Sequence, residues 1–140
     1  MSAELYDRAI VETAKASAEA QRLSAPDVTV EEDNPLCGDR IALDLAMADG
    51  RIAAVGHRTR GCLLTRAAAV VLARRAPGAD PAELRSAIAS LRDLLEGRNG
   101  PPAWPELSMF EPVRAVRSRH DCVLLPFRAL EEALDRLEER

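Results

Sequence analysis

Three cysteines and one aspartate are the residues of this chain whose types and positions are best suited to chemistry. Cys37, Cys62 and Cys122 lie 25 and 60 residues apart, and none of them belongs to a Cys-x-x-Cys pair. This spacing excludes a zinc ribbon and a thioredoxin-type redox motif. Dispersed cysteines commonly pack as small apolar side chains, so the sequence around each one decides whether it has a chemical role.

The first cysteine lies in a segment that also carries the aspartate. The run Asn34-Pro35-Leu36-Cys37-Gly38-Asp39 precedes a predicted strand. Residues i and i+2 of an extended segment face the same way, so Cys37 and Asp39 can present a thiolate and a carboxylate side by side. Gly38 has no side chain and leaves room for a metal ion or a partner to approach the backbone.

Cys62 and Cys122 each lie where a predicted helix begins. Free backbone N–H groups and the helix dipole lower the pKa of a thiol there, so we expect both to be thiolates. Three thiolates and the Asp39 carboxylate make a tetrahedral ligand set that suits zinc, or iron bound to sulfur. Arg119 and Arg60 are candidates for the positive charge that this set needs nearby. The oxygen ligand is the one most easily displaced, which favours transfer chemistry over a purely structural site.

The elements that must position these residues are predicted as strands early in the chain and helices late. The sequence predicts a small antiparallel sheet of three strands. The first strand covers residues 28–30, the second alternates from Arg40 to Met47, and the third returns at 51–59 after the Asp49-Gly50 turn. Helices are predicted from the cap Ser2 to about residue 23, from 61 to the stop at Pro77-Gly78, at 81–96 and 107–116, and from a start between Cys122 and Pro126 to the end of the chain. This order indicates an α+β fold with a sheet of about three strands covered by helices. The length indicates a single domain over residues 1–140.

The composition excludes several classes of protein. The 140 residues carry 23 acidic and 19 basic side chains, which argues against nucleic-acid binding because such proteins need a basic stripe. The longest apolar run, residues 67–73, is far shorter than the ~20 residues that span a bilayer. The first residues include acidic groups where a signal peptide is positive, and three cysteines cannot close a disulfide framework. We therefore expect a cytoplasmic protein with no membrane or nucleic-acid partner.

Three blocks of this sequence carry a resemblance to a known family. They are Asn34-Pro35-Leu36-Cys37-Gly38-Asp39, Gly61-Cys62 and Arg119-x-x-Cys122. In this order they resemble the signature blocks of the NifU/IscU scaffold proteins of iron–sulfur cluster assembly. Leu5-Tyr6 before a helix and Asp27-Val28-Thr29-Val30 before the first cysteine fit as well, so the resemblance covers essentially the whole chain. Within the family, the chain is most similar to the SufU branch, which carries an inserted stretch between its second and third cysteines.

The resemblance implies a fold, a metal site and partners. It implies a NifU/IscU-like fold in which Cys37, Asp39, Cys62 and Cys122 hold zinc, with Arg119 as a supporting charge. Cys37 is then the acceptor of persulfide sulfur from a cysteine desulfurase. The chain would either relay this sulfur as a zinc-dependent acceptor of the sulfurtransferase type, or assemble a transient iron–sulfur cluster on the same ligands. Downstream cluster-assembly or recipient proteins would take the product.

The chain also departs from the family pattern. Asp121 occupies the position directly before the third cysteine where the IscU branch has histidine, and His120 lies one position away. We therefore assign no ligand role to His120. Residues 63–68 replace a serine-rich run with Leu, Thr, Arg and Ala. Two alternatives remain open: a non-catalytic domain whose metal is purely structural, and a degenerate family member that acts by protein contact alone.

Overall fold

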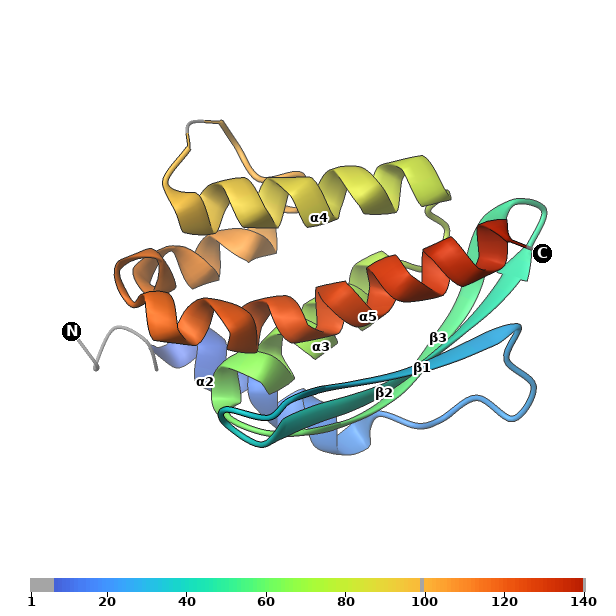
Figure 1. Cartoon of the computed structure of the whole chain (residues 1–140), viewed down its shortest axis with the longest axis horizontal. Coiled ribbons are helices and arrows are strands. Elements are labelled where there is room, and N and C mark those ends of the chain that lie inside the picture. Colours follow the sequence, from blue (N-terminus) through green and yellow to red (C-terminus); the bar gives the residue numbers. More distant parts are fainter. Residues whose placement is uncertain (1–6, 99, 140) are drawn as a thin grey trace.

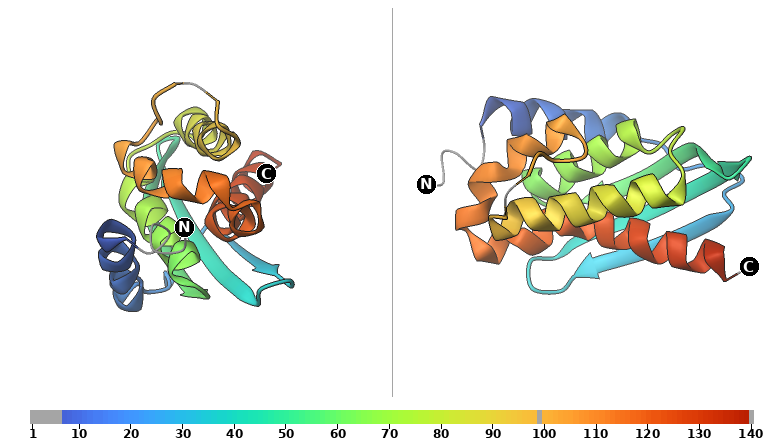
Figure 2. Two further views of the ribbon diagram at one scale, coloured as in Figure 1. Left: turned by 90° about the vertical axis from the view of Figure 1, so that its left-hand side faces the viewer. Right: turned by 90° about the horizontal axis from the view of Figure 1, so that it is seen from above.

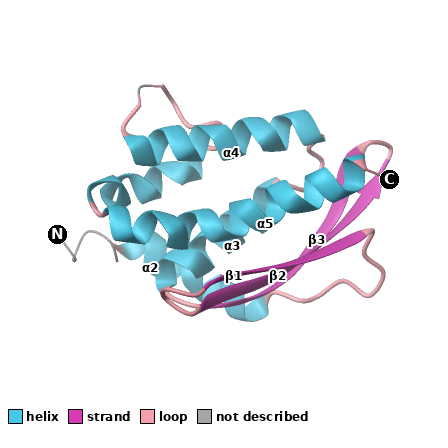
Figure 3. Cartoon of the chain, viewed as in Figure 1, coloured by secondary structure: helices cyan, strands magenta, loops and turns pink. Residues whose placement is uncertain are grey.

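The fold is one sheet covered on one face by helices, in a computed structural model that describes residues 7–98 and 100–139. Three antiparallel strands lie in the order β1-β2-β3 (Figure 1 and Figure 3). The strands are β1 (Val28–Asn34), β2 (Asp39–Ala48) and β3 (Arg51–Arg60). The helices are α2 (Arg8–Lys15), α3 (Leu63–Arg75), α4 (Pro81–Glu96) and α5 (His120–Glu138), with the 3₁₀ segments η1 (Ala16–Glu19), η2 (Pro105–Ala115) and η3 (Arg117–Arg119). The predicted α+β fold with a small antiparallel sheet is confirmed.

The core lies between the sheet and two helices. α5 packs against β1 and β2, α3 packs against β3, and these two helices contact each other. α4 lies beside α5 and forms an outer layer together with η2 (Figure 2). Ile41, Leu43 and Leu45 of β2 are completely buried, which confirms the alternation predicted for this strand. No helix in the described part of the chain is long and apolar enough to cross a membrane.

The β2–β3 hairpin forms where the sequence predicts it. Asp49 and Gly50 both have positive φ angles, 54° and 77°, which is the backbone conformation that two-residue hairpin turns need. The register shifts between Ala46 and Met47, because Met47 pairs with Ile52 while Ala46 pairs with Ala54. Ala53 is therefore the extra residue of a β-bulge, and this bulge is why the alternation of β3 is blurred in the sequence.

The helix α4 begins and ends as predicted. The Asp80 side chain accepts a hydrogen bond from the backbone N–H of Glu83 at 2.9 Å, and Pro81 is the first helical residue. Gly97 ends the helix with a φ of 81°. These are the local signals of a capped helix N-terminus and a glycine C-terminus, so no tertiary contact is needed to explain the bounds of α4.

The first predicted helix is wrong in length. α2 is capped by Asp7, ends at Lys15, and is followed only by the short η1 segment, whereas the prediction extended to about residue 23. The predicted cap Ser2 lies outside the described residues. The carbonyl of Gln21 accepts a hydrogen bond from the backbone N–H of His57. Residues 20–25 are therefore not helical, and Gln21 is bonded to the β3 backbone instead of to a helix.

Three other boundaries also differ from the prediction. β1 does not stop at residue 30 but continues to Asn34, because its acidic residues pair in register with β2. The helix predicted at residues 107–116 is instead the 3₁₀ segment η2, which starts at Pro105 and ends at Ala115. The last helix begins at His120 instead of between residues 122 and 126, and it continues through Pro126. The His120 ring explains the early start, since its Nε2 lies 3.1 Å from the carbonyl oxygens of both Val113 and Arg114.

Asp44 binds the segment around Arg22 and Leu23 to the outer face of the sheet. Its carboxylate accepts hydrogen bonds from Arg22 Nε at 2.6 Å, the backbone N–H of Leu23 at 3.0 Å and Thr29 Oγ1 at 2.6 Å. It is completely buried, although it points away from the core. Burial alone would raise the pKa of Asp44, but the hydrogen bonds from Arg22, Thr29 and Leu23 outweigh it and hold this pKa below its ordinary value.

Asp44→Asn is expected to lower the free energy of unfolding by about 2–3 kcal/mol, because the ion pair with Arg22 is lost and the amide that replaces the completely buried carboxylate turns an N–H₂ group toward donors. The lowered pKa means that the carboxylate stabilises the fold above pH ~4 and that this contribution is lost as the pH falls further. Urea unfolding at pH 7 and at pH 3 measures both effects. Glu12→Gln, which removes an exposed ion pair with Lys15, is the control and should change stability by less than about 0.5 kcal/mol. Equal effects of the two substitutions would contradict this role of Asp44.

Candidate metal centre

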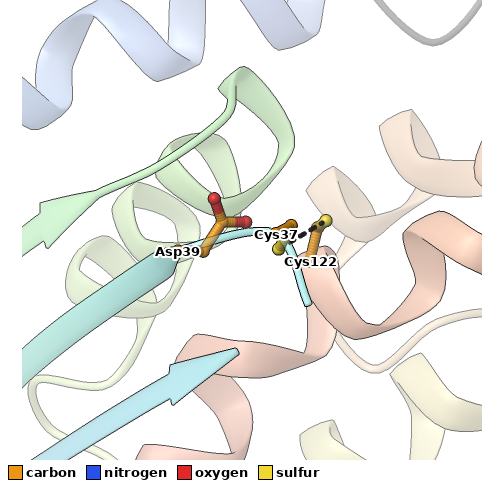
Figure 4. A group of neighbouring side chains, drawn as sticks. All are labelled: Cys37, Asp39 and Cys122. Atoms are coloured by element: carbon orange, nitrogen blue, oxygen red, sulfur yellow. Dashed lines mark hydrogen bonds between the residues drawn. The ribbon is translucent and has the colours of Figure 1, made fainter. Parts of the chain in front are cut away.

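The chain brings the predicted site residues together at one end of the sheet (Figure 1). Cys37 lies in the turn between β1 and β2, Asp39 is the first residue of β2, Cys62 is the N-cap of α3, and Cys122 is the third residue of α5. One ligand atom from each of Cys37, Asp39 and Cys122 lies within 4.8 Å of the others. Figure 4 shows these three side chains gathered at the start of β2 and α5. Two segments that are distant in the sequence, the turn before β2 and the start of α5, therefore meet at one point.

The turn that carries Cys37 is held by Asn34. The Asn34 side-chain oxygen accepts a hydrogen bond from the N–H of Leu36 at 3.1 Å, and its carbonyl accepts from the N–H groups of Cys37 and Gly38. Gly38 has a φ of 75°, a conformation that costs glycine little. Cys37 is exposed, and Leu36 beside it is 92% exposed. The turn thus presents the Cys37 thiol to solvent from an ordered backbone.

Asp39 is buried, and both of its carboxylate oxygens accept hydrogen bonds. Its Oδ1 accepts from the backbone N–H of Cys62 at 3.2 Å, and its Oδ2 accepts from the hydroxyl of Thr65 at 2.5 Å. Burial would raise the pKa of Asp39, but the hydrogen bonds from Thr65, Cys37, the Cys62 backbone and Cys122 together hold this pKa below its ordinary value. The side chain is therefore a carboxylate at neutral pH, which is the form that binds a metal ion.

Cys62 is half-buried, and its thiol has a lowered pKa. Its Sγ lies 3.6 Å from Asp39 Oδ2 and 3.5 Å from Thr65 Oγ1. A hydrogen bond from the Cys122 thiol is the main cause that lowers the pKa of Cys62 to about 6, against the opposing effect of burial. A lowered pKa of the Cys62 thiol agrees with the thiolate that the sequence predicts at this helix N-terminus. The Cys62 sulfur is not within 4.8 Å of all three other ligand atoms, so its side chain would have to turn to complete a four-ligand set.

The pKa expected for Cys122 is wrong in direction. Its thiol is buried, and its Sγ lies 3.9 Å from that of Cys37. The hydrogen bond that it shares with Cys62 raises the pKa of Cys122, and burial adds to this. Without a metal ion, the two cysteines therefore share one proton: Cys62 is the thiolate and Cys122 the thiol. The sequence shows that both residues begin helices but not that they compete for the same proton.

In the reduced, metal-free protein, alkylation of Cys62 is expected to reach half its maximal rate near pH 6, the pKa of its thiol, and not near the pKa of ~8.5 of a free cysteine. Only the thiolate reacts, so the rate rises with pH through the pKa and then levels off. Cys122→Ala removes the donor of the main hydrogen bond and should move the midpoint upward. Timed alkylation with peptide mass spectrometry measures the rate. A midpoint that Cys122→Ala leaves unchanged would contradict this origin of the shift.

Two of the donor–donor distances already match those around a tetrahedral metal ion. With Zn–S distances of about 2.3 Å and a Zn–O distance of about 2.0 Å, two sulfur ligands stand about 3.8 Å apart and a sulfur and an oxygen about 3.5 Å apart. The Cys37–Cys122 distance of 3.9 Å and the Cys62–Asp39 distance of 3.6 Å match these values. Two opposite edges of such a tetrahedron are thus present, and three sulfurs with one oxygen suit zinc or iron.

The remaining predicted residues lie around this group with different contacts. A hydrogen bond from the Arg119 side chain to Cys122 counteracts the rise in the pKa of that thiol, as a supporting charge should. Arg60 lines a cavity of about 180 Å³ behind the Cys37 turn. Nε2 of His120 bonds to backbone carbonyls, and Asp121 pairs with Arg128 at 2.6 Å. These contacts occupy Asp121 and the Nε2 atom of His120.

Sequence reasoning missed Thr65, which is completely buried beside Asp39 and Cys62. The signal was present, because Thr65 lies three residues after Cys62 and residues i and i+3 share a helix face. The contact with Asp39 could not be foreseen, since it joins α3 to the start of β2.

Comparison with known proteins agrees with the fold and with the first two of the three blocks. The model of the NifU-like N-terminal domain family matches residues 6–93, a range that contains Cys37, Asp39 and Cys62. The iron–sulfur cluster assembly scaffold protein IscU of Thermotoga maritima is 25% identical over 134 residues, 95% of this chain and 94% of that protein.

Solved structures extend this likeness to the complete fold. The crystal structure of the N-terminal part of a NifU-like protein from Brucella abortus superimposes with a TM-score of 0.91 at 31% identity, covering 98% of this chain and 96% of that one. A SUF-system scaffold protein from Fervidobacterium islandicum, at 22% identity, shares the fold with a TM-score of 0.88 over 93% of this chain and 96% of that one. The chain therefore belongs to the NifU-like N-terminal domain family of iron–sulfur cluster assembly scaffolds.

Proposed function

We propose that this protein accepts sulfane sulfur at Cys37 from a cysteine desulfurase during iron–sulfur cluster assembly, at a site where Cys37, Asp39, Cys62 and Cys122 hold a metal ion. The observation that carries the proposal is the convergence of an exposed thiol, a buried carboxylate and two further thiols from three separate segments. Membership of a cluster-assembly family supports the same reading.

Zinc is the ion that we propose for the site, because a donor set of three sulfurs and one oxygen suits it. When bound, zinc keeps its cysteine ligands deprotonated. Asp39 completes the set as the one oxygen ligand. Arg119, through its contact with Cys122, offsets part of the negative charge that three thiolates and a carboxylate accumulate.

The sulfur transfer itself is an exchange between two cysteines. The Cys37 thiolate attacks the outer sulfur of the persulfide on the donor cysteine. A new S–S bond forms at Cys37, the S–S bond of the donor breaks, and its electron pair leaves with the donor cysteine as a thiolate. The exchange consumes no external oxidant or reductant. Cys37 suits this role because it is the exposed one of the three thiols, whereas Cys122 is buried.

The same ligands can also receive iron, which would make a nascent iron–sulfur cluster the cargo of the site. The printed name of the Thermotoga maritima relative, a scaffold protein, favours this second outcome. Relay predicts a zinc-bound protein that passes sulfur to a recipient, and scaffolding predicts a cluster that absorbs visible light after anaerobic reconstitution with iron and sulfide. Both start from sulfur at Cys37, and we propose that both take place in the cytoplasm.

The proposal is tested by locating the transferred sulfur. The zinc-loaded protein is incubated with a cysteine desulfurase and L-cysteine, blocked with an alkylating reagent and digested. We expect one additional sulfur atom on the peptide that contains Cys37, and none when L-cysteine is omitted. Sulfur found first on Cys62 or Cys122, or on no cysteine, would overturn the proposal.

Chelation distinguishes this site from a purely structural metal. A structural zinc contributes directly to folding, so its removal unfolds the domain. Here a large buried core lies between the sheet, α3 and α5, and we expect the metal-free protein to retain its far-ultraviolet circular dichroism. Loss of that signal on chelation would favour the structural alternative.

A further inference from the structure

A buried hydroxyl links two of the four proposed ligands. Thr65 Oγ1 lies 2.5 Å from Asp39 Oδ2 and 3.5 Å from Cys62 Sγ. Thr65 is completely buried on the first turn of α3, and Asp39 is only 3% exposed. A buried charged oxygen is costly to leave without a donor, so Asp39 Oδ2 depends on the hydroxyl for its shortest hydrogen bond.

The hydroxyl has one proton and two neighbours that can accept it. The shorter contact shows that Thr65 donates to Asp39, while the sulfur of Cys62 lies within the longer range of a thiol–hydroxyl contact. The N–H of Cys62 holds the other carboxylate oxygen. Asp39 is therefore fixed from both sides by the first residues of α3, and it keeps lone pairs that face Cys37 and Cys122.

We infer that Thr65 is a positioning residue that orients the Asp39 carboxylate toward the three thiols and so determines how tightly the site holds its metal. The inference rests on the proposed function. Hydrogen bonds to a ligating carboxylate commonly change metal affinity 10–100-fold. Thr65 therefore also sets how readily Asp39 leaves the metal, which is the step that would open a position for sulfur chemistry.

The chain contains a matched control on the other face of the sheet. Thr29 Oγ1 donates to the buried carboxylate of Asp44 at 2.6 Å, nearly the same contact as that between Thr65 and Asp39. Asp44 points away from the core beneath residues 20–25 and is paired with Arg22. Thr29→Val removes an equivalent hydrogen bond without touching the proposed ligands.

The experiment measures zinc affinity by competition with a chromophoric chelator. Relative to the unaltered protein, we expect Thr65→Val to raise the zinc dissociation constant about 10–100-fold, mainly through faster release. Thr65→Ser keeps the hydroxyl and should remain within about threefold, and Thr29→Val should do the same although it lowers stability. Urea unfolding of each metal-free variant separates loss of folding from loss of binding.

A double-mutant cycle with Asp39→Ala makes the test specific. If Thr65 acts through Asp39, Thr65→Val causes no further loss of zinc affinity once the carboxylate is gone. The inference is overturned if Thr65→Val binds zinc as tightly as the unaltered chain, or if its effect persists in full beside Asp39→Ala. Those results leave sulfur acceptance at Cys37 untouched. Failure of the unaltered chain to bind zinc overturns both this inference and the proposed metal site.

Discussion

Cys37→Ser is expected to reduce sulfur acceptance from a cysteine desulfurase by more than about 100-fold, as removal of an attacking nucleophile does in enzymes. Serine keeps the size and the turn, whose hydrogen bonds to Asn34 involve only the backbone at this position. A hydroxyl is not deprotonated at neutral pH and cannot replace the thiolate in the exchange. The measurement is the amount of protein-bound persulfide after a fixed time with the desulfurase and L-cysteine.

The matched variants for Cys37 are Cys62→Ser and Cys122→Ser. Each removes one proposed zinc ligand while leaving the exposed thiol of Cys37 in place. We expect both to bind zinc more weakly and still to form some persulfide. Wild-type levels of persulfide on Cys37→Ser would mean that another cysteine is the acceptor.

Gly61→Ala is expected to displace Asp39 and to weaken zinc binding at least about 100-fold, the upper end of the range for disturbed ligand support. A methyl group at position 61 would overlap Asp39 Oδ1 and lie 2.6 Å from its carboxyl carbon. The φ of 152° at Gly61 is also strained for any other residue, which adds about 1–3 kcal/mol of destabilisation. Chelator competition and urea unfolding measure the two effects separately.

Gly50→Ala is the control for backbone strain. Gly50 also has a positive φ, 77°, but an added methyl group there meets nothing within 4 Å. We expect this variant to lose stability and keep full zinc affinity. If Gly61→Ala also keeps full zinc affinity, Asp39 does not pack against Gly61 or is not a ligand.

The parts of the fold that follow from local rules could be predicted from the sequence. The Asp49-Gly50 hairpin and the helix from Pro81 to Glu96 carry their own turn and capping residues, and both form at the predicted positions. The bounds of α2 and α5 could not be predicted in this way. The backbone hydrogen bond between Gln21 and His57 holds the segment after the first helix against the sheet, and the ring of His120 contacts η2 where the last helix begins. Those contacts are tertiary.

The residues of the site were predictable, but their electrostatics were not. Three short blocks identify the cysteines and Asp39, and the fold brings them together. The helix N-terminus argument gives the right direction for the pKa of Cys62 and the wrong one for Cys122. Two thiols in contact cannot both ionise easily, and a single sequence does not show which residues touch. The buried positions of Thr65 and Asp44 were missed for the same reason.

X-ray absorption at the zinc edge of the protein loaded with one equivalent of zinc tests the central claim most directly. We expect three sulfur atoms at about 2.3 Å and one oxygen at about 2.0–2.2 Å around the ion, with the oxygen replaced in Asp39→Ala. Three sulfurs require that Cys62 turns to join Cys37 and Cys122. A shell with two sulfurs or fewer, or an oxygen that does not depend on Asp39, would contradict the four-residue site.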